Sequence, residues 1–382
     1  MKILFISHDG SRTGAPMVLL HLISWLKNNS DYQFEVLFLR GGEMVDDFGK
    51  YAKTHVLTKG DQGLSYYIDK FYRKVLKINR EKKRLERLSN SLGKSGINLI
   101  YGNTSNTTKV ISTLKKELNV PVIIHSHELE GSMTRSGTLS YFDKTKPFIS
   151  KYIACSQLVK ENMLDKHSID ESKIELIHAF VKPQTPKLTS EEIKNSLGLE
   201  KDAIIIGGAG TLHWRKGIDF YLQLAYQVIK SQPDKDICFV WLGGDLCKKE
   251  VYLYNFDIEM WGIQDKVKLI GNKTNPWDYL NAFDMLVMTS REDPFPLVCI
   301  EAATLSKPIV CFNRGVGSAE FIDNQVSYLD LFEMTEAVNE LINSPEKRNI
   351  QGQALKERVS TFTLENMAPK VLSVIDTLIK QA

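Results

Sequence analysis

Asp293 and Glu301 are two carboxylic acids eight residues apart in the segment Arg-Glu-Asp-Pro-Phe-Pro-Leu-Val-Cys-Ile-Glu. The apolar run before it, residues 285–290, predicts a buried parallel strand, and residues 297–305 predict a helix. Glu301 is the one ionisable group of that helix, and a helix that is apolar all round is buried. Because a buried carboxylate requires hydrogen-bond donors, this acid is suited to a ligand with paired hydroxyl groups, such as a ribose diol.

The two prolines of this segment bear on where the helix begins. Pro294 and Pro296 fit the first turn of a helix, where a missing N–H costs nothing. Asp293 is then placed to cap that turn or to stand at its mouth. The alternative to a ligand site is therefore structural, with Asp293 as a helix cap and Glu301 as a core acid satisfied by the protein itself.

A second candidate site is the turn at residues 206–217, Ile-Gly-Gly-Ala-Gly-Thr-Leu-His-Trp-Arg-Lys-Gly. A glycine-rich turn between a strand and a helix lets the backbone approach an anion. Arg215 and Lys216 adjoin it, and paired cations suit a diphosphate whose charge grows as it departs. The spacing is not that of a Walker A loop. A solvent-facing basic pair is the alternative.

Three further loops follow predicted strands and carry polar or glycine residues. The first, at residues 7–16, contains Gly14, and the second ends the run Val-Ile-Ile-His-Ser-His-Glu with His127. The third, at residues 313–320, contains Gly317 and Glu320. Ligands bind at the C-terminal edge of parallel sheets. Plain βα turns and a structural histidine are the alternatives.

Strands and helices alternate along the whole chain, which predicts two parallel α/β sheets. The expected strands of the first half are residues 2–7, 34–39, 98–101, 120–125, 152–154 and 174–177. Those of the second half are residues 203–207, 237–242, 267–270, 285–289 and 308–312. Helices are expected at residues 15–28 and 109–118, among others. Residues 181–189 contain two prolines and little apolar content, and we interpret them as a linker.

Composition limits the classes of function. The 382 residues allow two domains, and 43% hydrophobic with 25% charged residues is ordinary for globular proteins. A net charge of +3 is too small for a dedicated nucleic-acid binder. Five cysteines without a CxxC pair indicate reduced, buried thiols of a cytosolic protein. No metal-ligand spacing, signal peptide or membrane span is apparent.

Taken together, these motifs resemble the retaining GT-B glycosyltransferases of the bacterial family 4 type, the glycosyl transferases group 1. The resemblance covers nearly the whole chain and implies two Rossmann-like domains that face each other across a cleft. We expect an N-terminal, acceptor-side domain at 1–182 and a nucleotide-sugar donor domain at 183–363. A final helix at 364–382 would cross back to the first domain.

The resemblance also implies roles for single residues. His127, Lys216 and Asp293 would be catalytic, with His127 lining the donor-sugar site and Asp293 contacting the donor sugar. Glu301 would bind the donor ribose. The other expected donor-binding residues are Gly14, Thr211, Arg215, Leu297, Val298, Gly317 and Glu320. The chain departs from the family pattern at Thr211, where an arginine is usual, and at Asp293, Pro296 and Val316. Arg215 is the candidate to replace the missing arginine.

The function implied is transfer of a hexosyl unit from a nucleotide diphosphate sugar to a glycan or lipid-linked acceptor in cell-surface polysaccharide synthesis. We expect a UDP-sugar as donor, no cofactor, no metal and no nucleic acid. A cytoplasmic location is expected, with contact to anionic membrane through the basic amphipathic stretch at 70–94 as a hypothesis. A solvated helix there is the alternative. A sugar-nucleotide epimerase and a non-catalytic binding module are the alternative functions.

Overall fold

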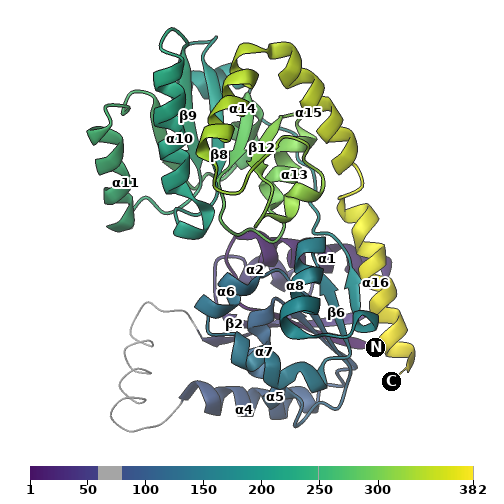
Figure 1. The fold of residues 1–382 in the computed structure, drawn as a ribbon. Helices are drawn as coiled ribbons and strands as arrows, with labels where there is room; N and C mark the ends of the chain where they lie inside the picture. Colours follow the sequence, from purple (N-terminus) through teal and green to yellow (C-terminus); the bar gives the residue numbers. More distant parts are fainter. Residues whose placement is uncertain (59–79, 248, 382) are drawn as a thin grey trace. The chain divides into compact units, whose positions relative to one another are not determined.

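The computed structural model describes residues 1–58, 80–247 and 249–381, which form two compact units (Figure 1). Unit 1 contains residues 1–180 together with residues 364–382. Unit 2 contains residues 181–363. The last helix of the chain thus belongs with the first unit rather than with the unit that precedes it in sequence.

Unit 1 is built on a seven-stranded sheet in the order β3-β2-β1-β4-β5-β6-β7. All its pairings are parallel. Its strands are β1 (Lys2–Ser7), β2 (Gln33–Arg40), β3 (Lys53–Thr58), β4 (Leu99–Asn103), β5 (Val122–Ser126), β6 (Lys151–Ala154) and β7 (Ile174–Leu176). All residues of β4 and β5 are buried, as expected for central strands covered on both faces.

The helices of unit 1 pack in groups along this sheet. Helix α5 contacts both α4 and α7, and α1 contacts α16. Their bounds are α1 (Gly14–Asn29), α2 (Val45–Gly49), α4 (Arg80–Gly93), α5 (Thr108–Leu114), α6 (Glu130–Arg135), α7 (Leu139–Thr145), α8 (Gln157–His167) and α16 (Leu364–Gln381). The first turn of α1 begins directly after the loop that leaves β1, so this loop is held at both ends.

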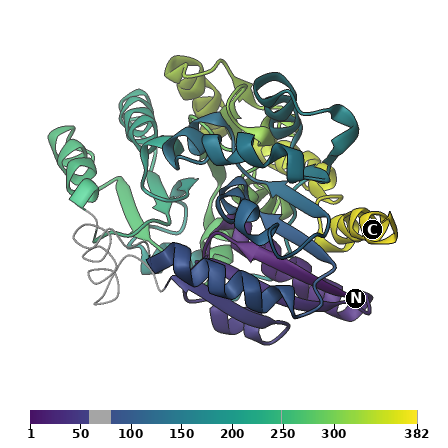
Figure 2. The same ribbon diagram turned by 90° about the horizontal axis from the view of Figure 1, so that it is seen from below.

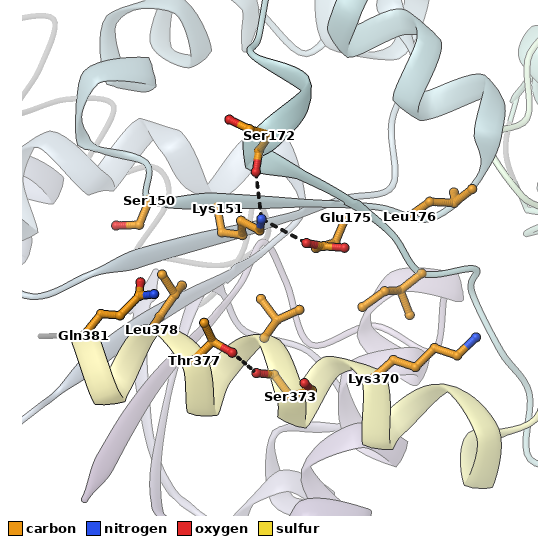
Figure 3. Close-up of a pocket in the computed structure, with 12 residues that line it drawn as sticks. Ser150, Lys151, Ser172, Glu175, Leu176, Lys370, Ser373, Thr377, Leu378 and Gln381 are labelled. Carbon is orange, nitrogen blue, oxygen red and sulfur yellow. Dashed lines mark hydrogen bonds and ion pairs between the residues drawn. The ribbon is translucent and has the colours of Figure 1, made fainter.

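Helix α16 is fixed to unit 1 by apolar and polar contacts. Val371 and Ile375 on its inner face are fully buried, and the Tyr32 hydroxyl donates to Asp376 Oδ1 at 2.6 Å. Between α16 and strands β6 and β7 lies a cavity of about 490 Å³. Lys151 at its wall is already bonded to the Ser172 carbonyl and paired with Glu175 (Figure 3). Both views show the two chain termini close together on unit 1 (Figures 1 and 2).

Unit 2 is built on a six-stranded sheet in the order β10-β9-β8-β11-β12-β13, again with parallel pairings. Its strands are β8 (Ile204–Ala209), β9 (Ile237–Leu242), β10 (Val267–Gly271), β11 (Met285–Met288), β12 (Ile309–Phe312) and β13 (Gln325–Val326). Tyr221, Phe239 and Trp241 are buried in its core and meet edge to face.

The helices of unit 2 form two sets. Helix α10 contacts α11 and α14, and α13 contacts α15 (Figure 1). Helix α9 contacts α12. Their bounds are α9 (Ser190–Ser196), α10 (Ile218–Ser231), α11 (Lys249–Met260), α12 (Pro276–Ala282), α13 (Leu297–Thr304), α14 (Leu331–Asn343) and α15 (Pro345–Val359). Helix α9 opens the unit with a capping box, in which Thr189 and Glu192 satisfy each other's backbone N–H groups.

The predicted α/β class with two parallel sheets is confirmed, and the differences are local. Strands β3 and β13 were not predicted. Of the five cysteines, all unpaired, Cys247 is exposed, contrary to the expectation of buried thiols, and the other four are buried. Among the described residues, no helix combines the length and the apolar composition needed to cross a bilayer.

The basic stretch expected at 70–94 is described only in part, because residues 59–79 lie outside the described residues. The described part is α4, on which Leu85 and Leu92 are buried. Helix α4 packs against α5 and β3 of its own unit. Its apolar stripe is therefore used within unit 1, while the lysines and arginines of α4 lie largely toward solvent.

Candidate functional site

In each unit the order of strands reverses at one point, and the predicted site residues follow the strands beside that point. In unit 2 the reversal lies between β8 and β11, and in unit 1 it lies between β1 and β4. Open α/β sheets bind ligands outside the carboxyl ends of the strands at such a switch point. The loop after β8 carries Arg215 and Lys216, and the loop after β11 carries Asp293.

Lys216, Arg215 and Asp293 form one charged cluster at the edge of the second sheet. Lys216 Nζ hydrogen-bonds to Asp293 Oδ2, and Arg215 Nη1 lies 3.7 Å from Asp293 Oδ1. Burial alone would raise the pKa of Asp293, but the charges of Lys216 and Arg215 outweigh it and hold that pKa below its usual value. Two cations thus share one carboxylate, which leaves the cluster with a net positive charge.

Backbone bonds from three loops hold this cluster. The Asp293 N–H donates to the Gly315 carbonyl at 2.7 Å, and the Gly317 N–H donates to the Asp293 carbonyl at 2.8 Å. The Arg291 N–H donates to the Arg215 carbonyl at 2.9 Å. The predicted residues Arg215, Asp293 and Gly317 are thereby brought together, and the loop after β12 acts as a backbone support for Asp293.

Arg291 is an organising residue that the sequence analysis did not identify. Its guanidinium makes two bonds to the Asp219 carboxylate, at 2.8 and 2.6 Å. The same group lies 3.9 Å from the centre of the Phe220 ring and 4.8 Å from that of Trp214. It also donates to the Trp214 carbonyl at 2.7 Å. Arg291 therefore fastens the turn that presents Arg215 and Lys216 to the loop that presents Asp293.

Gly217 is required where the same turn meets the end of β11. Its φ is +68°, and a Cβ at this position would lie 1.8 Å from the Thr289 carbonyl oxygen. The Thr289 hydroxyl donates to the Gly217 carbonyl at 2.8 Å. Only glycine allows this approach, so the position of Lys216 depends on its neighbour having no side chain.

Helix α13 begins at Leu297, where the helix predicted at 297–305 also begins, but the two prolines lie outside it. Its first residue is Leu297 and its N-cap is Pro296, so Pro294 and Pro296 precede the helix rather than occupying its first turn. The capping role considered for Asp293 is wrong, because its carboxylate is bonded to Lys216 and no side chain caps α13. The N–H groups of Leu297 and Val298 lie in the first turn, where N–H groups lack partners within a helix.

Glu301 lies on α13, and burial raises its pKa to about 7, although the side chain keeps some contact with solvent. Within the described part of the chain, no protein group donates a hydrogen bond to its carboxylate. The satisfied-core alternative for Glu301 is therefore not what the structure contains. A carboxylate in this condition gains stability from any ligand that brings hydroxyl donors.

Two predicted donor-binding residues lie at the margin of this cluster. Thr211 is exposed in the loop after β8. Glu320 is exposed at the end of the short 3₁₀ turn Gly317–Glu320, which follows β12. The roles expected for both stay predictions.

The site residues of unit 1 converge on Asn103 at the end of β4. Asn103 Nδ2 donates to the Ala15 carbonyl in the first turn of α1 at 2.8 Å, and its Oδ1 lies 3.2 Å from His127 Nε2. Because an amide oxygen only accepts, His127 Nε2 carries the proton and Nδ1 is the free acceptor. Asn103 therefore links the helix that begins at Gly14 to His127.

His127 is neutral at physiological pH. Burial and then the nearby His8 lower its pKa to about 3, and the centre of its ring lies 4.1 Å from that of His125, with the two rings tilted by 39°. The adjacent Glu128 carboxylate accepts from the N–H groups of Ser105 and His127, at 2.9 and 3.1 Å. The site can therefore use His127 to accept or donate a hydrogen bond, but not as a cationic acid.

The described residues divide the predicted site into two parts. Arg215, Lys216, Asp293, Gly317 and the α13 residues Leu297, Val298 and Glu301 belong to unit 2, whereas Gly14 and His127 belong to unit 1. In the described part of the chain, no three His, Cys, Asp or Glu side chains are grouped to hold a metal ion. In unit 2, the cluster at Asp293 offers an anion the positive charges of Arg215 and Lys216.

Comparisons with known proteins agree with this geometry. Residues 189–358 match the family described as Glycosyl transferases group 1. An uncharacterized glycosyltransferase of Methanocaldococcus jannaschii, MJ1178, is 23% identical over 370 residues, which cover 94% of each chain. An Escherichia coli UDP-Gal:alpha-D-GlcNAc-diphosphoundecaprenol alpha-1,3-galactosyltransferase is 20% identical over 380 residues, 94% of this chain and 95% of the relative.

A solved structure extends the similarity to the fold of the whole chain. The crystal structure of Anabaena Alr3699/HepE in complex with UDP and glucose superposes with a TM-score of 0.83 at 17% identity. The match covers 99% of this chain and 100% of that one. The predicted GT-B type of fold is confirmed at this level.

Proposed function

We propose that the chain is a retaining hexosyltransferase of the glycosyl transferases group 1, the family whose model matches residues 189–358. It moves a hexosyl unit from a nucleotide diphosphate sugar to a hydroxyl of a glycan or lipid-linked acceptor in cell-surface polysaccharide synthesis. The E. coli relative is a UDP-Gal:alpha-D-GlcNAc-diphosphoundecaprenol alpha-1,3-galactosyltransferase, and this name supports the same class of reaction here.

The observation that carries the proposal is that Arg215 and Lys216 both lie beside the Asp293 carboxylate at the switch point of the second sheet. When the bond between the sugar C1 and the phosphate oxygen breaks, the departing diphosphate gains negative charge. Fixed cations and the N–H groups of Leu297 and Val298 stabilise that charge without reorganising. The resident Asp293 already orients Lys216, so the cation is held in place before the donor arrives.

Glu301 supplies the second part of donor recognition. Its carboxylate has no donor from the described residues and is partly desolvated. The two hydroxyls of a ribose offer two hydrogen bonds to the two oxygens of a carboxylate. We assign Glu301 to the ribose, and Thr211, Gly317 and Glu320 to the surroundings of the nucleotide sugar. Asp293 would contact the sugar with the oxygen that Lys216 does not use.

The proposal also includes the residues of unit 1. Gly14 would approach the diphosphate through its backbone, and neutral His127 would bond a sugar hydroxyl through Nδ1. UDP is the expected nucleotide, supported by the UDP bound in HepE. The reaction on this proposal uses no metal, because Arg215 and Lys216 supply the positive charge.

We also propose that α4 contacts anionic membrane. The exposed lysines and arginines of α4 support it, and the burial of Leu85 and Leu92 limits it to electrostatic attraction. Co-sedimentation with anionic vesicles that persists in high salt would contradict an electrostatic contact.

A donor panel tests the function. Incubation with UDP-, GDP- and ADP-sugars is expected to give slow hydrolysis of one donor, with release of the nucleoside diphosphate and free sugar. That donor should also raise the thermal unfolding midpoint. An epimerised nucleotide sugar without release would instead identify an epimerase. Binding without any hydrolysis or transfer would favour the non-catalytic alternative.

A further inference from the structure

Helix α11 (Lys249–Met260) presents an apolar face to solvent. The large apolar side chains on this outer face are strongly exposed: Tyr252 by 71%, Leu253 by 61%, Phe256 by 48% and Met260 by 68%. The opposite face is used within unit 2, where Val251 and Ile258 are buried. Figure 1 shows α11 at the periphery of unit 2, beside α10. A solvent-exposed helix face usually carries polar residues, so the apolar outer face of α11 indicates a binding surface.

The spacing on the outer face indicates what kind of partner fits. Lys249, Leu253, Phe256 and Met260 follow one another at intervals of four, three and four residues. This is the 3.5-residue repeat of a helix seam that packs against another helix. The buried Ile258 lies on the other side of α11, so the seam faces directly away from the core of its own unit.

The charges along the seam select the orientation of the partner helix. Lys249 is exposed at the start of α11, and Asp257 and Glu259 lie near its end. Two copies of α11 packed antiparallel would place Lys249 of each copy beside Glu259 of the other. Leu253 of each copy would then face Phe256 of the other. The helix dipoles would also oppose each other favourably.

We propose that α11 is a self-association surface through which two copies of this chain pair antiparallel about a two-fold axis. Such an interface is isologous, because the same patch is used by both copies. The four exposed apolar side chains offer on the order of 500 Å² per copy. This is less than the ~800 Å² per partner of standard stable interfaces, so the dimer is weak and forms with rising concentration.

The same charges argue against a lipid surface as the occupant. Besides Lys249, the described helix carries Glu250, Asp257 and Glu259, so its flanks are predominantly acidic. Interfacial helices that bind anionic membranes carry lysine and arginine on their polar flanks. A second copy of α11 would cover the apolar seam and would also place a lysine beside the acidic end.

Sedimentation velocity of the full chain tests the surface. Over roughly 1 to 200 µM, a range that spans micromolar dissociation constants, the sedimentation coefficient should rise from monomer toward dimer. Leu253→Asp should remain monomeric over the whole range. The matched control is Ile350→Asp on α15, since Ile350 is also 61% exposed, and this variant should associate like the wild type. Circular dichroism of both variants checks that they are folded.

A charge exchange tests the antiparallel geometry. Lys249→Glu and Glu259→Lys should each be monomeric, because like charges meet in both homodimers. An equimolar mixture of the two variants should dimerise, because each chain then meets its opposite charge at both ends.

Three results would overturn the proposal. One is a wild-type chain that stays monomeric throughout the range, and another is a Leu253→Asp variant that associates normally. The third is a wild type that co-sediments with phosphatidylcholine–phosphatidylglycerol vesicles when Leu253→Asp does not, since that result assigns the face to lipid.

Discussion

Lys216 reaches the Asp293 carboxylate from a loop that follows a different strand of the second sheet. The two loops are neighbours because β8 and β11 pair, although the residues lie 77 positions apart in sequence. A lysine bonded in this way is held by the protein before any ligand is present. The arrangement makes its charge a fixed part of the site rather than a mobile surface charge.

Replacing Lys216 by alanine should lower turnover by roughly 10²–10³, the effect of removing one preorganised donor to developing charge. Lys230→Ala is the matched control, because Lys230 is on the neighbouring helix α10 and lies over the Tyr226 ring instead. Steady-state transfer or donor hydrolysis measures the effect. Unchanged turnover in Lys216→Ala would remove this residue from the mechanism.

Gly217→Ala should destabilise unit 2 by more than about 3 kcal/mol, because the new Cβ cannot coexist with the Thr289 carbonyl. Gly198→Ala is the control with nearly the same φ, +66°, and nothing within 4 Å of its Cβ. It should cost only about 1–2 kcal/mol, the strain of a left-handed residue. Urea unfolding of both variants gives the difference, and equal losses would show that the close approach carries no energy.

Arg291→Lys should destabilise the protein by about 2 kcal/mol, within the range for breaking a partly buried ion-pair network, and should lower turnover, although it keeps the charge. Lysine cannot make the two bonds to Asp219 or stack on Phe220. The corresponding exposed pair is Arg358 with Asp323, at 2.6 Å. Arg358→Lys should change stability by less than about 0.5 kcal/mol. A similar response of the two variants in thermal unfolding would contradict the role given to Arg291.

Glu301→Gln should remove a pH dependence of donor affinity. The folded pKa of Glu301, about 7, is above the ordinary 4.5, so the unliganded fold favours the protonated acid. The free energy of unfolding of the unliganded protein therefore falls as pH rises from 4.5 through 7, by at most about 3 kcal/mol. Ribose hydroxyls favour the carboxylate instead, so binding releases a proton and affinity should rise with pH.

Calorimetry with a nucleotide sugar measures this, because its diphosphate does not titrate near neutrality. Wild-type affinity should increase by up to about tenfold between pH 6 and 8, and that of Glu301→Gln should change little. A wild type whose affinity is constant over this range would show that the carboxylate does not meet the ligand.

The sequence predicted the parts of the fold that depend on continuous apolar runs. Central strands such as β5 and β9 are buried on both faces, so their composition alone identified them. Strand β3 was not predicted because Leu57 is its one buried residue. Strand β13 was not predicted because it has only two residues. Such edge strands are defined by their neighbours and not by their own pattern.

The site was predictable in residue type but not in pairing. Arg215, Lys216, Asp293 and Glu301 were recognisable because charges beside glycine turns or within an apolar helix are conspicuous. Arg291 directly precedes Glu292 and Asp293 in sequence, yet its partner is Asp219 on α10. That contact depends on the pairing of β8 with β11, which brings the start of α10 beside the loop after β11, and no local spacing encodes it. Asn103 was missed for the same reason, since Ala15 and His127 are distant in sequence.

Because α16 belongs to unit 1, that unit is completed only at the end of synthesis. The first 180 residues emerge from the ribosome long before the helix that covers part of their surface, because the whole of unit 2 is translated in between. Until then, the groups that α16 later contacts, Tyr32 among them, have no partner from it. A nascent chain stalled anywhere within unit 2 therefore displays an unfinished first unit, and chaperone binding to such stalled chains should end only when the final helix has been released.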